Sequence, residues 1–152
     1  MAENQGSPAK FANRYRFQPV RDDWDSGRSG YTHLVFDHVE ERLCVIKRAE
    51  LKDQKAVDEL KNEVGALLDL KGSDVPEVYD TGEAEYGSKN YFYMVIEYIE
   101  GMRIEKNLDN LSAIERAEIL TQLFGLLARA HQMGIANGDV DLKHLFWRGE
   151  RC

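Results

Sequence analysis

Residues 43–70 read LCVIKRAELKDQKAVDELKNEVGALLDL and change from one structural period to another. The run from Leu43 to Lys47 is apolar and of strand length, whereas residues 53–70 carry apolar side chains at helical spacing. At 100° per residue, the apolar residues of this second part share one arc: Leu70, Leu67, Leu60, Val64, Val57 and Leu68. We therefore predict a β-strand followed by an amphipathic helix that ends at Gly72.

Glu63 breaks the apolar arc of this helix, because it falls between Leu70 and Leu67. A carboxylate that faces a core is costly unless it is paired. Lys47 is the candidate partner, since alternation along the strand places it on the same face as Val45. A surface lysine and a helix-edge glutamate are the alternative, and the joint pattern favours the pair.

Strand-forming runs flank this unit on both sides and predict two antiparallel hairpins. The first run, His33 to Phe36, precedes the strand at residues 43–47, and the second hairpin consists of residues 77–84 and 91–99 around the loop 86–90. Residues 14–24 mix aromatic and charged side chains and predict an extended lead-in or edge strand.

A second, longer helix is expected near the C-terminal end of the chain. Ser112 and Glu115 form the capping box S-x-x-E, and helical periodicity continues over residues 113–133 until Gly134. The apolar arc of this helix is wide, which predicts a largely buried helix. His131 lies on the arc and is expected to be a hydrogen-bonded core histidine.

The composition bounds the class of protein. The chain has 152 residues, enough for one domain with its own core, and a net charge of −7, which weighs against a general nucleic-acid binder. Cys44 and Cys152 make no disulfide framework, and no Cys/His spacing is typical of a zinc site. The N-terminus lacks a signal-peptide core and no apolar run is long enough to span a membrane, so we expect a cytoplasmic protein.

The order of these elements, with the residues at their junctions, resembles the protein-kinase-like superfamily. The stretch C-V-I-K at residues 44–47 is similar to that family's V-A-I-K strand, and Glu63 matches the glutamate that pairs with its lysine. The resemblance implies an α+β fold: a small lobe with a five-stranded antiparallel sheet and one helix, then a hinge and the first long helix of an incomplete large lobe. We expect a disordered tail over residues 1–12, the small lobe over 13–99, and the hinge exit, long helix and catalytic loop over 100–152.

The resemblance also implies a set of ATP-binding residues, carried over position by position. Residues 27–36 look like the family's phosphate-covering loop, in which Gly27 keeps the first glycine, Ser29 and Thr32 replace the second and third, and Leu34 takes the place of the valine. Residues 94–101 resemble the strand that enters the hinge. The implied ATP-binding residues are Gly27, Ser29, Gly30, Leu34, Val45, Lys47, Glu63, Ile96, Glu97 and Ile99.

Residues 127–139 look like the end of the long helix and the catalytic loop of that family, with Asn137-Gly138-Asp139 at its tip. The resemblance makes Asp139 the catalytic aspartate. Asp141 stands where protein kinases have a lysine, and His144 stands where they have a metal-binding asparagine. Bacterial lipopolysaccharide-core sugar kinases of this superfamily also have a histidine at this place. The implied cofactors are ATP and Mg²⁺ or Mn²⁺, with His144 on the metal side.

The function implied is transfer of the γ-phosphate of ATP to a hydroxyl on a protein or a cell-envelope sugar. No Asp-Phe-Gly follows the catalytic loop before Cys152, so we expect this chain to be inactive alone. A pseudokinase or a nucleotide-binding regulatory module is the alternative, and an acidic interaction domain without nucleotide is a third. The apolar face of the helix at 113–133 is a candidate surface for a homodimer.

Overall fold

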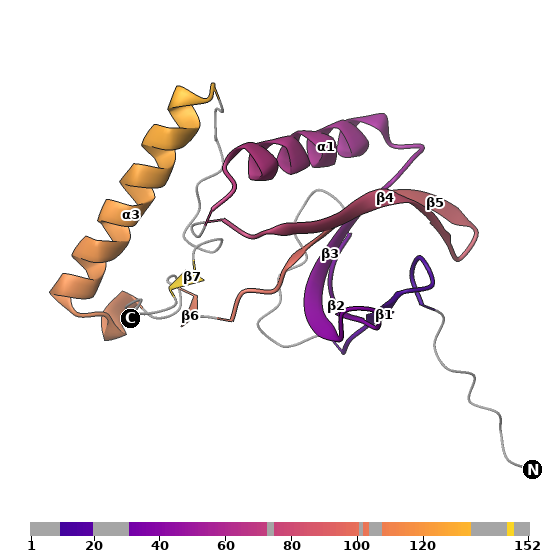
Figure 1. Cartoon of the computed structure of the whole chain (residues 1–152), viewed down its shortest axis with the longest axis horizontal. Coiled ribbons are helices and arrows are strands. Elements are labelled where there is room, and N and C mark those ends of the chain that lie inside the picture. Colours follow the sequence, from indigo (N-terminus) through magenta and orange to yellow (C-terminus); the bar gives the residue numbers. More distant parts are fainter. Residues whose placement is uncertain are drawn as a thin grey trace, which may run out of the picture. The chain divides into compact units, whose positions relative to one another are not determined.

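The computed structural model describes residues 10–19, 31–72, 75–100, 102–103, 108–134 and 146–147 (Figure 1). The chain divides into two compact units. The first contains the residues before 69 together with 77–98, and the second contains residues 69–76 and those from 99 onward. No helix among the described residues is long and apolar enough to cross a membrane.

The first unit is built on a five-stranded antiparallel sheet with the strand order β1-β2-β3-β5-β4. Its strands are β1 (Tyr15–Phe17), β2 (Tyr31–Asp37), β3 (Arg42–Glu50), β4 (Val78–Tyr86) and β5 (Lys89–Glu97). The helix α1 (Gln54–Asp69) runs along the sheet (Figure 1). The expected α+β architecture, a curled antiparallel sheet with one helix, is confirmed.

The central strand β3 is buried on both faces, and the two faces meet different cores. Residues 45 and 49 pack in a cluster with α1, which we call the helix-side core: Val45, Ala49, Val57, Leu60, Met94 and Ile96. Residues 44 and 46 pack in a second cluster, which we call the turn-side core: Phe11, Tyr15, Val35, Cys44, Ile46, Tyr91, Tyr93 and Val95. This division follows from the alternation of side chains along a strand.

The helix α1 begins and ends within one residue of the expected bounds, 53–70. Asp53 caps its first turn, because its carboxylate accepts the backbone N–H of Ala56 at 3.2 Å. Val57 and Leu60 are buried, as the apolar arc predicts, whereas Leu68 at the other end of the helix is exposed.

The second hairpin is tighter than expected, because its loop is a two-residue turn at Gly87-Ser88 instead of residues 86–90. Both turn residues have positive φ, 60° and 67°, which the type I′ hairpin turn requires. Pairing therefore extends to Tyr86 and Lys89, and β5 ends at Glu97 instead of at residue 99.

A β-bulge interrupts the pairing of β4 with β5. Val78 lies opposite Ile96, but Asp80 lies opposite Val95, so one extra residue of β4 is inserted between them. Strict alternation would place Asp80 on the same face as Val78. The bulge turns it to the opposite face, that of Val95 and the turn-side core.

The start of the folded chain lies earlier than the sequence predicts. The composition of residues 1–12 predicts a disordered tail, yet within this stretch Phe11 is fully buried and pairs with Tyr15 in an isolated bridge. Ala12 and Asn13 have positive φ and reverse the chain direction between the two. The apolar contacts of Phe11 are made with residues distant in sequence, which local composition does not reveal.

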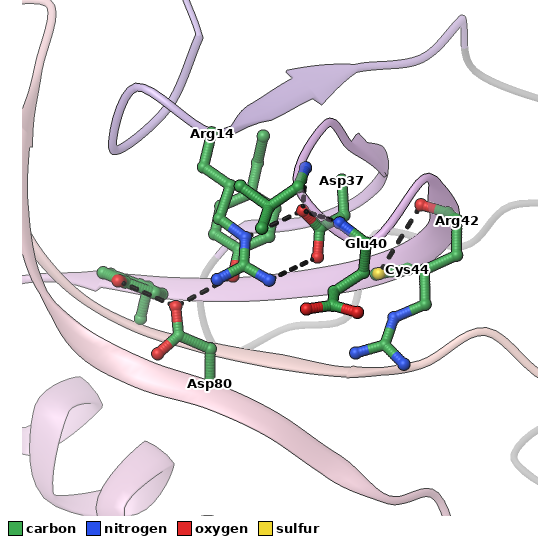
Figure 2. A network of polar contacts seen from close by, with 9 residues as sticks. Arg14, Asp37, Glu40, Arg42, Cys44 and Asp80 are labelled. Carbon is green, nitrogen blue, oxygen red and sulfur yellow. Dashed lines mark hydrogen bonds and ion pairs between the residues drawn. The ribbon is translucent and has the colours of Figure 1, made fainter.

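Asp37 is the one fully buried charged residue among those that the structure describes. Its carboxylate accepts two hydrogen bonds of 2.7 Å from the guanidinium of Arg14, and a third of 2.9 Å from the backbone N–H of Val39. Figure 2 shows Arg14 pointing toward both Asp37 and Asp80. The bidentate hydrogen bond to Arg14 lowers the pKa of Asp37 to about 2.

The second unit contains the strands β6 (Met102–Arg103) and β7 (Phe146–Trp147), which pair antiparallel, and the short helix η1 (Leu108–Asn110). The long helix α3 (Ala113–Gln132) begins with the predicted capping box, in which Ser112 and Glu115 bond reciprocally. Arg129 of α3 donates a 3.4 Å hydrogen bond to the carbonyl of Leu70 in the same unit.

Two expectations for α3 are wrong. The helix is not largely buried, since Ile114 and Phe124 are 72% and 64% exposed, and His131 is exposed instead of lying in a core. Helical periodicity shows which side chains share an arc, but it does not show what covers that arc.

We predict that Arg14→Met lowers the free energy of unfolding by about 2 kcal/mol at neutral pH, because it leaves the buried carboxylate of Asp37 without its charged donor. Since the pKa of Asp37 falls from 3.8 to about 2 on folding, the contribution of the pair is present above about pH 4 and is lost as the pH falls toward 2. Thermal melts of the wild type and of Arg14→Met should therefore show a clear difference in stability at neutral pH. This difference should become smaller as the pH falls toward 2.

Arg16→Met is the matched control, because it removes the same charge two residues away without the loss of a hydrogen bond to Asp37. If Arg14→Met and Arg16→Met destabilise the protein equally at every pH, the Arg14–Asp37 pair has no special role.

Candidate functional site

Lys47 of β3 and Glu63 of α1 form an ion pair, in which the Lys47 Nζ donates a hydrogen bond to the Glu63 Oε1. The predicted pairing is therefore confirmed. The two side chains are 31% and 41% exposed, so both remain open to solvent. The carboxylate of Glu63, which interrupts the apolar arc of α1, is thus paired with a cation at the edge of the helix-side core.

An apolar row crosses the sheet beside this pair. Leu34 of β2 lies directly opposite Val45 of β3, and Val45 lies directly opposite Ile96 of β5. Partners in an antiparallel pair point to the same face, so the three side chains stand in line, and all three are buried. We call them the apolar row. The family resemblance assigns each of them separately to the ATP site, and the register of the sheet brings them together.

Lys47 lies two residues beyond Val45 on the same face of β3, opposite Thr32 and Met94. Met94 is fully buried in the helix-side core next to the ion pair. Met94 is not among the ATP-binding residues that the resemblance implies, although it lies two residues before Ile96 on the same strand face. This face of the sheet thus carries a row of buried apolar side chains with a cation beside it.

The end of β5 is held by the residue that precedes β4. The backbone N–H of Glu97 donates to the carbonyl of Glu77 at 2.9 Å, and the side chain of Glu97 accepts the N–H of Glu77 at 3.2 Å. Ile99 follows the strand and is half-buried. The hinge role of Glu97 and Ile99 is a prediction that rests on the family resemblance.

The remaining predicted site residues lie outside the described part of the chain: Gly27, Ser29, Gly30, Asp139 and His144. Their roles stay predictions. Among the residues that are described, no three His, Cys, Asp or Glu side chains gather to hold a metal ion.

The model of a protein family, the phosphotransferase enzyme family, matches residues 26–151. The match covers most of the chain, so the protein belongs to this kinase-like family of phosphotransferases. The sheet, the α1 helix and the Lys47–Glu63 pair described above agree with the kinase-like small lobe that the sequence predicted.

The chain is also similar to parts of three curated proteins, two of which are serine/threonine-protein kinases by name. It is 28% identical over 149 residues to the serine/threonine-protein kinase PksC of Streptomyces coelicolor, with 89% of this chain and 27% of the relative covered. It is 25% identical over 131 residues to the serine/threonine-protein kinase PrkC of Bacillus subtilis, with 82% and 19% covered. A shorter match, 31% over 77 residues, is to the KEOPS complex subunit Bud32 of Pyrococcus abyssi, covering 51% of this chain and 32% of the relative.

We predict that Glu63→Gln changes the free energy of unfolding by no more than about 1 kcal/mol, because a partly exposed ion pair contributes little to stability. Ile96→Ala should cost ~2–5 kcal/mol, because it leaves a cavity in a core. Chemical denaturation of the two variants checks both values. A loss of several kcal/mol in Glu63→Gln would mean that the pair is a structural element of the fold.

Proposed function

We propose that the protein is an ATP-dependent phosphotransferase, or the part of one, in which the helix-side face of the sheet binds the nucleotide. One observation carries the proposal: the Lys47–Glu63 ion pair lies next to the apolar row on the same strand face. An apolar surface suits the flat face of a purine ring, and a cation beside it suits phosphate oxygens.

Each residue of this site has a task under the proposal. Leu34, Val45 and Ile96 contact the adenine ring, and the backbone of Glu97 and Ile99 binds its polar edge. Lys47 neutralises phosphate charge, and Glu63 holds the amine of Lys47 in place. Gly27, Ser29 and Gly30 approach the phosphates through their backbone N–H groups.

The transfer itself depends on residues outside the described part of the chain. Asp139 accepts or orients the proton of the acceptor hydroxyl. Mg²⁺ or Mn²⁺, when bound, neutralises charge on the phosphates, and His144 is a candidate ligand for it. The apolar row and Lys47 support the proposed nucleotide site. The proposed metal site rests on His144 alone, which lies outside the described part of the chain.

The acceptor we favour is a hydroxyl group on a protein, because two of the relatives are serine/threonine-protein kinases by name. A cell-envelope sugar is the other acceptor, which His144 favours through the resemblance to sugar kinases. The chain spans 27% and 19% of the first two relatives' lengths, so the activity proposed is that of a protein with a complete large lobe. The chain alone is proposed to be inactive, since it contains no Asp-Phe-Gly.

A second candidate function is nucleotide-dependent regulation without catalysis. The lysine and asparagine expected after Asp139 are replaced by Asp141 and His144 in this sequence. Under this alternative the site binds nucleotide, and the exposed side chains of α3, Ile114 and Phe124 among them, meet a partner such as a second copy of the chain.

We predict that Lys47→Met weakens ATP binding by about tenfold or more, because it removes a charge-assisted contact to phosphate. Ligand-induced thermal shifts, measured with ATP in the presence of Mg²⁺ or Mn²⁺, report this affinity. Lys61→Met is the control, since Lys61 is an exposed lysine of α1 that makes no ion pair with Glu63. Equal shifts in the wild type and Lys47→Met would place the nucleotide elsewhere.

We also predict that Asp139→Asn reduces phosphate transfer in the full-length protein by about 10²–10⁴-fold and leaves ATP affinity unchanged, because Asp139 faces the acceptor hydroxyl. Single-turnover transfer from labelled ATP separates the two effects. Wild-type turnover in Asp139→Asn would favour the regulatory alternative.

A further inference from the structure

Residues 11–15, which we call the N-terminal latch, close the face of the sheet opposite α1. The backbones of Phe11 and Tyr15 exchange hydrogen bonds of 2.8 and 2.9 Å, so the chain doubles back between them. Both side chains are fully buried in the turn-side core. Without them, the apolar side chains of β2, β3 and β5 on this face would be exposed to solvent.

Two carboxylates fasten the latch to strands distant in sequence. Arg14 binds Asp37 at the end of β2, as described above, and the hydroxyl of Tyr15 donates to the Asp80 Oδ2 at 2.8 Å. The hydroxyl of Tyr93 donates to the same oxygen at 3.1 Å. Figure 2 shows Arg14 extended between the two carboxylates. The latch is thus joined to both sides of β3.

The receiving surface on β4 is shaped for these contacts. The bulge before Asp80 turns its side chain to the face of the latch. Gly82 lies opposite Tyr93, and a Cβ at this position would come within 3.1 Å of the Tyr93 hydroxyl. The absence of a side chain at Gly82 therefore leaves room for Tyr93 to reach Asp80.

Arg48 of β3 lies near an aromatic ring of the latch, Phe11, and near three rings around it. Its guanidinium carbon lies among four aromatic rings, with distances to the ring centroids of 4.6 Å for Tyr91, 5.1 Å for Phe17, 5.4 Å for Tyr86 and 5.8 Å for Phe11. These distances are within the range of cation–π attraction. Arg48 directly follows Lys47 in β3, so the two side chains leave the same strand on opposite faces.

We propose that the N-terminal latch, acting through Arg48, fixes the position of β3 and thereby holds the amine of Lys47 against Glu63. Arg48 is a positioning residue: it lies near the Phe11 ring of the latch and near the rings of Phe17, Tyr86 and Tyr91 around it, and it acts on the site through the backbone of β3. The consequence for nucleotide binding rests on the function proposed above. By thermodynamic linkage, a ligand that needs Lys47 in place also stabilises the closed latch.

The experiment compares three variants without any nucleotide. Tyr15→Phe and Tyr93→Phe each remove one hydrogen bond to the same oxygen of Asp80, but only Tyr15 belongs to the latch. Arg48→Met removes the guanidinium and keeps an apolar stem. Hydrogen exchange is measured at the amides of Gln18 and His38, which bond to the carbonyls of Leu34 and Arg14 and so report whether β1 is closed on β2.

Tyr15→Phe and Arg48→Met should each raise exchange at these amides by about three- to tenfold, and Tyr93→Phe should leave it unchanged. The second measurement is the rate at which an acylating reagent labels the amine of Lys47, relative to the exposed Lys61. This ratio should rise by about five-fold or more in Arg48→Met. If Arg48→Met does not fold, Arg48→Lys, which keeps the charge and loses the planar group, is measured in the same way.

Equal exchange in Tyr15→Phe and Tyr93→Phe would overturn the latch. Increased exchange in Arg48→Met with an unchanged Lys47 labelling ratio would overturn its coupling to the site. ATP affinity of the same variants in the full-length protein is measured separately. Failure of the wild type to bind ATP would refute the proposed function, whereas exchange and labelling would still support or overturn the latch, because both are measured without nucleotide.

Discussion

The strand β3 is buried on both faces, and this constraint organises the first unit. Val45 and Ala49 pack against α1, while Cys44 and Ile46 pack against the N-terminal latch. Successive side chains of such a strand enter the two cores in turn, so the neighbouring cations Lys47 and Arg48 also lie on opposite faces. Lys47 points to the helix side and pairs with Glu63, whereas Arg48 points to the other side and lies among four aromatic side chains. The face of β3 on which each cation lies therefore determines the core beside it.

The site combines a firm support with a weakly stabilising ion pair. The apolar row is fixed by the hydrogen-bonded register of three neighbouring strands, whereas Lys47 and Glu63 are 31% and 41% exposed. A partly exposed ion pair contributes little to folding. Under the proposed function, this exposure leaves the cation accessible to an anionic ligand while the carboxylate of Glu63 holds its direction.

Much of this architecture could be predicted from the sequence. The change of period within residues 43–70 predicts β3 and α1, and the capping box at Ser112 predicts the start of α3. Glu63 stands out on the helix without any knowledge of its partner, because a single carboxylate in an apolar arc is energetically unfavourable without one. The exposure of α3 and the burial of Phe11 could not be predicted, since both depend on what lies against them in three dimensions.

The sequence by itself determined which residues alternate along β3, where the two helices begin, and that Glu63 needs a cation. The tertiary structure alone decided which residues meet across the sheet. Pairing register places Leu34, Val45 and Ile96 in one line, although they are far apart in the chain. The β-bulge in β4 shows the physical reason most directly: one inserted residue moves Asp80 from the helix side to the latch side, where Tyr15 and Tyr93 bind it. Alternation in the sequence predicts the opposite face, and only the pairing with β5 reveals the insertion.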